Sequence, residues 1–146
     1  MSGEEGGRER ERVRSLRDDR LAGVVAHGGD GRIGFLRVFD RHDFASPLHF
    51  VDYAVLPPGA SIGRHTHGRD EELYLVLAGT GTMHLDGREF RVGPGSVILN
   101  RAGGTHGLRN DSDQEIRLFV VEVGLDGARD AGRDAGRDAG SGGVHA

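Results

Sequence analysis

The sequence contains no cysteine, lysine or tryptophan, and these absences limit the metal ligands and catalytic groups that the protein can use. Without cysteine there is no disulfide, thiolate ligand or cysteine nucleophile, so any metal ion must be bound by histidine and carboxylate side chains. All 19 basic residues are arginine, which excludes Schiff-base chemistry and a lysine general base. No apolar run approaches the roughly 20 residues that span a bilayer, and the N-terminus is charged where a signal peptide would be apolar. We therefore expect a cytoplasmic protein that does not bind membranes.

The charge distribution argues against nucleic acid as a partner. The 146 residues carry a formal net charge of −4. Arginines are interspersed among acids and form no basic stripe of the kind that follows a phosphate backbone. A chain of this length holds one domain rather than two. We expect one core and one site, with a small molecule as the partner.

The two ends differ in composition from the middle. Residues 1–22 are dense in acids and arginines, which predicts a charged tail or a short surface helix, or alternatively an arm that packs on a partner subunit. Residues 126–146 repeat Ala-Gly-Arg-Asp, followed by a short segment that begins with serine and two glycines. Such a segment buries nothing and is expected to be disordered. The folded domain is expected over residues 23–125.

The middle consists of short apolar segments separated by turn residues. Their alternating or continuous apolar character predicts nine strands, at 32–39, 50–56, 61–67, 72–78, 81–85, 89–92, 96–99, 105–109 and 116–123. Asp86-Gly87 predicts a type I′ hairpin turn, because that turn needs positive φ at both central residues. Strands with regular turns and no helical periodicity indicate an all-β sandwich or closed barrel. The cysteine and tryptophan core of an immunoglobulin-like sandwich is missing.

Three histidines and a carboxylate point to a metal site. His65 and His67 are two residues apart, so on a strand both imidazoles project from the same face and can chelate one ion. Glu72 opens the next predicted strand and would lie close to this pair in a hairpin. His106 follows a glycine-containing turn on a later strand. Mixed nitrogen and oxygen donors argue against Ca²⁺ and Mg²⁺, which prefer all-oxygen shells.

Across roughly residues 50–123, the sequence closely resembles the cupin family. The family's first motif, G-x5-H-x-H-x4-E-x6-G, is matched at every fixed position, by Gly59, His65, His67, Glu72 and Gly79. The second motif, G-x5-P-x-G-x2-H-x3-N, is matched by Gly95, Gly103, His106 and Asn110. Only its proline differs, being Arg101 here. This change affects the shape of the loop before Gly103, because arginine does not fix φ as proline does, and it leaves the ligand positions untouched.

The resemblance implies an all-β fold of the cupin type, a double-stranded β-helix or jelly-roll barrel with one divalent metal ion inside one end. It implies the ligands His65, His67, Glu72 and His106 and an ion such as Fe, Mn, Ni, Co or Zn. Glu71 is the alternative carboxylate, since some cupins use a three-residue spacer, but the count to the following motif glycine favours Glu72. Family members are commonly dimers, so a homodimer is expected.

Three further residues are candidates for the chemistry. Tyr74 shares the strand parity of the carboxylate ligand and is expected to face the barrel interior, either as a core aromatic or as a catalytic or substrate-binding group. His84 occupies an alternating position that would let it line the cavity as an acid/base group, although a lone histidine is more often structural. Arg101 is preferred to Arg64 and Arg109 as the residue that binds a substrate carboxylate near the mouth. The remaining histidines are assigned no role.

These features predict a mononuclear divalent-metal enzyme that acts on a small polar metabolite. The fold does not choose among oxygenase, cyclase, isomerase and lyase chemistry, although a bacterial natural-product pathway would suit a small stand-alone cupin. The alternative is a non-catalytic cupin that binds a metabolite or a sugar and acts as a sensor. The sequence shows no helix-turn-helix segment to favour that alternative. A storage or structural cupin is a third class, but its members often lose the ligands that are all present here.

Overall fold

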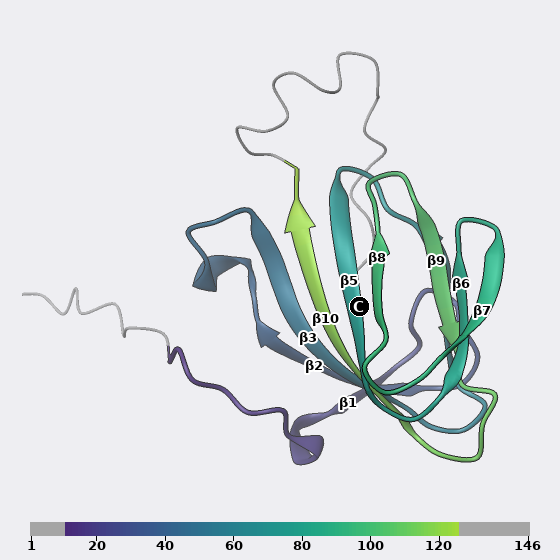
Figure 1. The fold of residues 1–146 in the computed structure, drawn as a ribbon. Helices are drawn as coiled ribbons and strands as arrows, with labels where there is room; N and C mark the ends of the chain where they lie inside the picture. The colour runs from purple at the N-terminus through teal and green to yellow at the C-terminus, as the bar shows by residue number, and fades with distance from the viewer. Residues whose placement is uncertain (1–10, 126–146) are drawn as a thin grey trace, which may run out of the picture.

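Two antiparallel β-sheets face each other in the computed structural model, which describes residues 11–125 (Figure 1). Ten strands lie within these residues, namely β1 (Ala22–Val24), β2 (Ile33–Phe39), β3 (Leu48–Leu56), β4 (Ser61–Thr66), β5 (Asp70–Ala78), β6 (Gly81–Leu85), β7 (Arg88–Val92), β8 (Val97–Asn100), β9 (Thr105–Arg109) and β10 (Ile116–Gly124). Two short 3₁₀ turns are also present, η1 (Asp18–Arg20) and η2 (Arg41–Asp43). The sheets converge at one end and separate toward the other (Figure 1).

The larger sheet has the strand order β1-β2-β3-β10-β5-β8, and the smaller has the order β4-β9-β6-β7. The chain passes from the larger sheet to the smaller after β3 and returns after β4, as in a jelly roll. The predicted all-β fold class is confirmed. All nine predicted strands are present, with ends that differ by no more than two residues. The sequence pattern does not predict β1, which has only three residues with a glycine at its centre.

The predicted hairpin turn joins β6 to β7. Asp86 has a φ of 48° and Gly87 a φ of 83°, so both central residues have the positive φ of a type I′ turn. The two strands pair in register along their whole length. The turn prediction is therefore confirmed.

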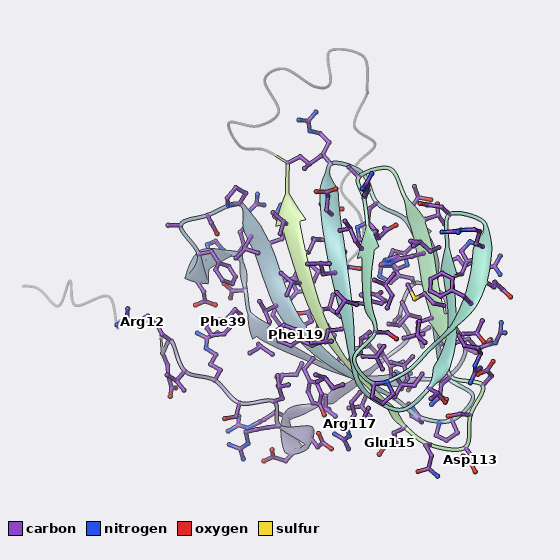
Figure 2. The ribbon with its side chains drawn as sticks, in the orientation of Figure 1. Arg12, Phe39, Asp113, Glu115, Arg117 and Phe119 are labelled. Atoms are coloured by element: carbon purple, nitrogen blue, oxygen red, sulfur yellow. The ribbon has the colours of Figure 1, made fainter. Side chains whose placement is uncertain are left out.

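Inward side chains from both sheets fill the space between them (Figure 2). Buried and exposed positions alternate along β5 and β10, as the pleat of a strand requires. The largest apolar members of this core are Ile33, Phe50, Leu56, Ile62, Tyr74, Met83, Leu108, Ile116 and Leu118. Burial of this apolar surface is the main driving force for folding. Toward the end where the sheets separate, polar side chains replace apolar ones on the same inward faces.

Residues 11–21 lie against the outer face of the larger sheet. Arg14 forms an ion pair with Asp43 at 3.1 Å. Asp18 accepts hydrogen bonds from the Tyr53 hydroxyl and from Arg117, both at 2.8 Å. This part of the predicted N-terminal tail therefore contacts its own sheet, and its only helical element is η1.

The segment 126–146, for which the sequence predicts disorder, lies outside the described residues, as do residues 1–10. Within residues 11–125 no helix has the length and apolar character needed to cross a membrane. The cytoplasmic location and the lack of a nucleic-acid partner stay predictions.

Candidate metal centre

The four predicted ligands meet at the end where the sheets separate. His65 lies on β4, His67 directly follows that strand, and His106 lies on β9. Antiparallel pairing places His65 opposite His106, and β5 brings Glu72 from the facing sheet. One donor atom from each of the four lies within 4.8 Å of the others. The alternative carboxylate, Glu71, is outside this group, because strand alternation turns it to the other face.

The turn between β8 and β9 fixes the backbone at His67. The N–H of His67 donates to the Gly104 carbonyl at 2.9 Å, and the His67 carbonyl accepts from the Gly103 N–H at 3.0 Å. The turn is closed by a 2.8 Å bond from the Gly104 N–H to the carbonyl of Arg101, the residue at the motif's proline position. The two motif halves are thus hydrogen-bonded to each other, and the turn forms without the proline.

The donor atoms face one another at close range. His106 Nε2 lies 3.0 Å from His67 Nε2 and 3.1 Å from His65 Nε2. Glu72 Oε1 lies 3.0 Å from the His106 nitrogen and 3.3 Å from the His67 nitrogen. Both Glu72 oxygens are buried and accept no hydrogen bond from the described residues. These spacings suit ligands that surround one ion at about 2.1 Å from each donor.

Hydrogen bonds behind the rings select the imidazole tautomers. His65 Nδ1 lies 2.7 Å from the Gly63 carbonyl oxygen, which can only accept. His67 Nδ1 lies 2.6 Å from the Asp70 carboxylate. Each Nδ1 therefore carries the proton, and in the neutral ring the Nε2 lone pair points at the centre. A carbonyl or carboxylate behind a ligating imidazole is the usual arrangement in metal sites.

Burial keeps two of the three rings neutral. It lowers the pKa of His65 to about 4 and the pKa of His106 to about 2, and the neighbouring histidines lower the latter further. At neutral pH these two imidazoles therefore present lone pairs rather than positive charge. That is the state in which imidazole binds a metal ion.

Three carboxylates have the opposite effect on His67. Burial alone would lower the pKa of His67, but the adjacent carboxylates of Asp70, Glu122 and Glu72 raise it to about 11. Burial raises the pKa of Glu72 to about 7. The negative field that holds a proton at His67 also favours a divalent cation, which would displace that proton on binding.

The donor set fits a divalent transition ion. It offers imidazole nitrogen and carboxylate oxygen, without sulfur, and so differs from the all-oxygen shells of Ca²⁺ and Mg²⁺. Three of the four side chains are fully buried, so their positions are set by packing before any ion binds. A bound ion would act as a Lewis acid toward ligands in its open positions.

Tyr74 and Arg101 both lie at or near this end. Tyr74 is fully buried, and its ring centroid lies 4.6 Å from that of His106. Burial and the charge of Glu72 raise the pKa of Tyr74 well above its usual value, so the phenol stays protonated. Arg101 is exposed on the turn that is hydrogen-bonded to His67. A catalytic or substrate-binding role for either residue stays a prediction.

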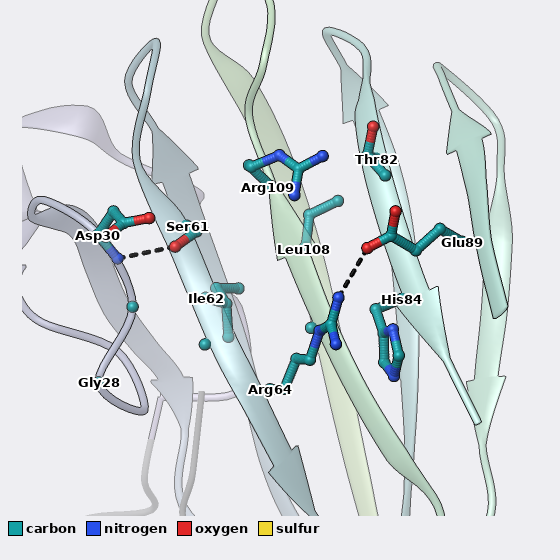
Figure 3. Close-up of a pocket in the computed structure, with 13 residues that line it drawn as sticks. Gly28, Asp30, Ser61, Ile62, Arg64, Thr82, His84, Glu89, Leu108 and Arg109 are labelled. Carbon is teal, nitrogen blue, oxygen red and sulfur yellow. Dashed lines mark hydrogen bonds and ion pairs between the residues drawn. The ribbon is translucent and has the colours of Figure 1, made fainter. Parts of the chain in front are cut away.

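The expectation that His84 lines the barrel interior is wrong. Met83 is the fully buried residue on this part of β6, so its neighbour His84 points to the outer face of the smaller sheet. There it lines a shallow pocket of about 200 Å³ with Arg64, Glu89 and Arg109, and an ion pair joins Arg64 to Glu89 at 2.7 Å (Figure 3). This position gives no support to an acid/base role at the metal centre. Alternation shows that neighbours face opposite sides, but not which of them faces inward.

Two histidines that the motifs do not include lie next to the ligands. His27, in the loop between β1 and β2, stacks on His65 with ring centroids 3.5 Å apart and planes 8° from parallel. His49 on β3 contacts Glu122 at 2.9 Å, and Glu122 lies 3.3 Å from Nδ1 of His67. No spacing along the chain marks either histidine, because the fold brings them to the site.

An arginine that belongs to neither motif lies on the inward face of β2. Arg37 on β2 donates to the fully buried Asp52 through Nε and Nη2, at 3.0 and 3.1 Å. Its guanidinium carbon lies 4.3 Å from the centroid of the Phe50 ring, which belongs to the core. Arg64 and Arg109, the alternatives to Arg101, line the outer pocket instead. Arg37 therefore lies on the inward face of the larger sheet with its charge paired to Asp52.

Facing jelly-roll sheets with three imidazoles and a carboxylate between them at one end define the cupin class of protein. A family model described as a cupin domain matches residues 52–122. Residues 52–122 of this chain therefore match the cupin domain family.

Relatives of this chain include proteins of several kinds. An oxalate-binding protein from Thermotoga maritima is 25% identical over 96 residues, which are 66% of this chain and 79% of that protein. The crystal structure of a predicted oxalate decarboxylase from Thermotoga maritima aligns with a TM-score of 0.71 at 23% identity, over 77% of this chain and 100% of that one. The polyketide cyclase RemF from Streptomyces resistomycificus aligns with a TM-score of 0.61 at 24% identity, over 78% and 80% of the two chains. At these identities the structural likeness establishes the fold.

Proposed function

We propose that this protein binds one divalent transition ion at a mononuclear centre formed by His65, His67, Glu72 and His106, and binds a small polar metabolite there. The observation that carries the proposal is the convergence of three Nε2 atoms and one carboxylate oxygen at contacts of 3.0 to 3.3 Å. The hydrogen bonds behind His65 and His67 support it, because they direct lone pairs at the centre. The name of the oxalate-binding relative supports a small carboxylate as the ligand class.

We infer further that the protein acts on this metabolite as an enzyme. The Tyr74 phenol stays protonated beside His106, and the exposed Arg101 offers positive charge for a carboxylate. Relatives named as a cyclase and as a predicted decarboxylase support catalysis, in a natural-product pathway or elsewhere. The second candidate, a non-catalytic metabolite-binding cupin with a sensing role, is favoured by the name of the oxalate-binding relative.

Metal analysis tests the centre directly. Protein stripped with a chelator and reloaded with Mn²⁺, Fe²⁺ or Zn²⁺ should bind the ion tightly, and His106→Ala should bind one equivalent fewer or bind it about 100-fold more weakly. His42→Ala removes an exposed histidine outside the cluster and serves as the matched control. Circular dichroism checks that both variants fold. Parental affinity in His106→Ala would contradict the proposed centre.

A substrate screen separates the enzyme from the binding module. Metal-loaded protein is incubated with oxalate and other small carboxylates, and substrate loss and oxygen uptake are followed with and without the metal. Turnover that is lost in His106→Ala supports the enzyme. Binding detected by calorimetry without turnover of the bound ligand supports the module.

We infer that a homodimer forms through the outer face of β5 and β8. Leu73, Leu77, Val97 and Leu99 are exposed there on paired strands, and β8 is an edge strand. Contiguous apolar surface of this kind marks a protein interface. Val97→Glu should convert the dimer to a monomer in analytical ultracentrifugation. A dimer that survives this change would contradict the assigned face, and a monomeric parent would contradict the dimer.

A further inference from the structure

A second group of potential ligands lies on the far side of His67 from the proposed centre. His49 on β3, Asp70 on β5 and Glu122 on β10 each offer a donor atom within 4.8 Å of the other two. His49 Nδ1 lies 2.9 Å from Glu122 Oε2. Asp70 Oδ1 and Glu122 Oε1 lie 2.6 and 3.3 Å from His67 Nδ1. His67 therefore separates the two groups, with one ring nitrogen turned toward each.

Both carboxylates of this group are buried against histidine rings. The side chain of Asp70 is 2% exposed and that of Glu122 is fully buried. Their ion pairs with His67 and His49 carry charge only when those rings are protonated. Buried carboxylates are stable when they are paired or bind a metal.

His49 is the member of this group that faces a pocket. It is half-buried and lines a pocket of about 260 Å³ with Arg41, Pro47 and Leu48. Gly124 makes room for its ring, since a Cβ at that position would lie only 2.3 Å from His49 Nε2. The His49 side of the group is therefore the side nearest to this pocket, whereas Asp70 and Glu122 are buried behind it.

We propose that His49, Asp70 and Glu122 form a second divalent-cation site, separate from the centre that would bind the metabolite. One imidazole nitrogen and two carboxylates suit a transition ion such as Zn²⁺ or Mn²⁺. The ion joins β3, β5 and β10, three adjacent strands of the larger sheet. It also fixes the carboxylates behind His67. The metabolite-binding centre remains mononuclear.

Metal stoichiometry tests this site. Full-length protein is stripped with a chelator, titrated with Zn²⁺ against a chromophoric competitor, and analysed for bound zinc after gel filtration. The parent should bind about two equivalents, and His49→Ala and Glu122→Gln about one. Gly124→Ala should also bind about one, because its methyl group displaces the His49 ring. His42→Ala, the matched control, should keep both.

The outcomes separate this site from the proposed function. One equivalent in the parent, lost in His106→Ala and retained in His49→Ala, would overturn the second site and leave the centre intact. One equivalent in the parent that is lost in His49→Ala but retained in His106→Ala would establish the second site and overturn the centre. No bound zinc in the parent would overturn both. If Glu122→Gln fails to fold, His49→Ala at the half-buried position decides the question.

Discussion

The two ends of the space between the sheets are built from the same strands and contain opposite kinds of side chain. On β10, Leu118 and Val120 point inward in the apolar core, whereas Glu122 points inward at the metal end. On β5 the same change occurs between Val76 and Glu72. The strand pairing is continuous where the inward side chains change from apolar to polar. The same strands therefore form the core at one end and position the metal donors at the other.

Buried polar groups show the same contrast. At the apolar end the Asn110 amide donates to the carbonyls of Leu56 and Gln114, at 2.9 and 2.7 Å, and its oxygen accepts from Ser112. Glu72 is buried just as completely, but its oxygens accept no hydrogen bond from the described residues. A satisfied amide costs little stability, while an unsatisfied carboxylate costs a good deal. The apolar end therefore stabilises the fold. The buried donors of the metal end lower the stability of the metal-free protein and are suited to binding an ion.

The largest effect on stability is expected at the apolar end. Leu118 is fully buried, so Leu118→Ala should lower the free energy of unfolding by about 3 kcal/mol through lost burial and the cavity left behind. Urea denaturation in the presence of a chelator measures this loss. Val25→Ala, at an exposed position just after β1, is the control and should change little. Leu118 is not one of the metal donors, so the metal affinity of Leu118→Ala should stay near the parental value. A tenfold loss of affinity would contradict the division into two ends.

A smaller effect is expected from the ring that covers His65. His27→Ala removes the stacked surface and should weaken metal binding about tenfold, since the His65 ring would lose the cover on one of its faces. His27→Phe keeps an aromatic face at the same position, where φ is 50°, and should retain most of the affinity. Titration calorimetry with Mn²⁺ compares the two variants. Equal losses in both would show that backbone strain, rather than stacking, is the cause.

Most of the fold and the four donors could be predicted from the sequence because short-range patterns determine them. Period-two alternation marks the strands, and Asp86-Gly87 marks the hairpin. His65 and His67 share a face because they are two residues apart. The donors gather where the sheets separate because the motif spacings place each of them near a strand end.

The rest of the site depends on register and loop packing, which leave no local signal. His49 is next to the inward-facing Phe50, so simple alternation would turn it away from the core. A bulge in the pairing of β3 with β10, between Glu122 and Val123, lets His49 reach Glu122 instead. The stacking of His27 likewise depends on how the loop between β1 and β2 packs against β4, which the sequence does not encode within any short window.

The smallest effect, and the one most specific to the metal end, is expected from Glu72→Gln. Glutamine keeps the shape of the side chain and removes the buried charge, so the metal-free variant should be as stable as the parent or more stable by about 1 kcal/mol. In the presence of Mn²⁺ the order should reverse, because the parent gains binding free energy that the variant loses. Paired urea denaturations, one with a chelator and one with Mn²⁺, measure the two differences. If Glu72→Gln were less stable than the parent in both conditions, the carboxylate would be part of the stabilising core, and the division between the two ends would fail at its central residue.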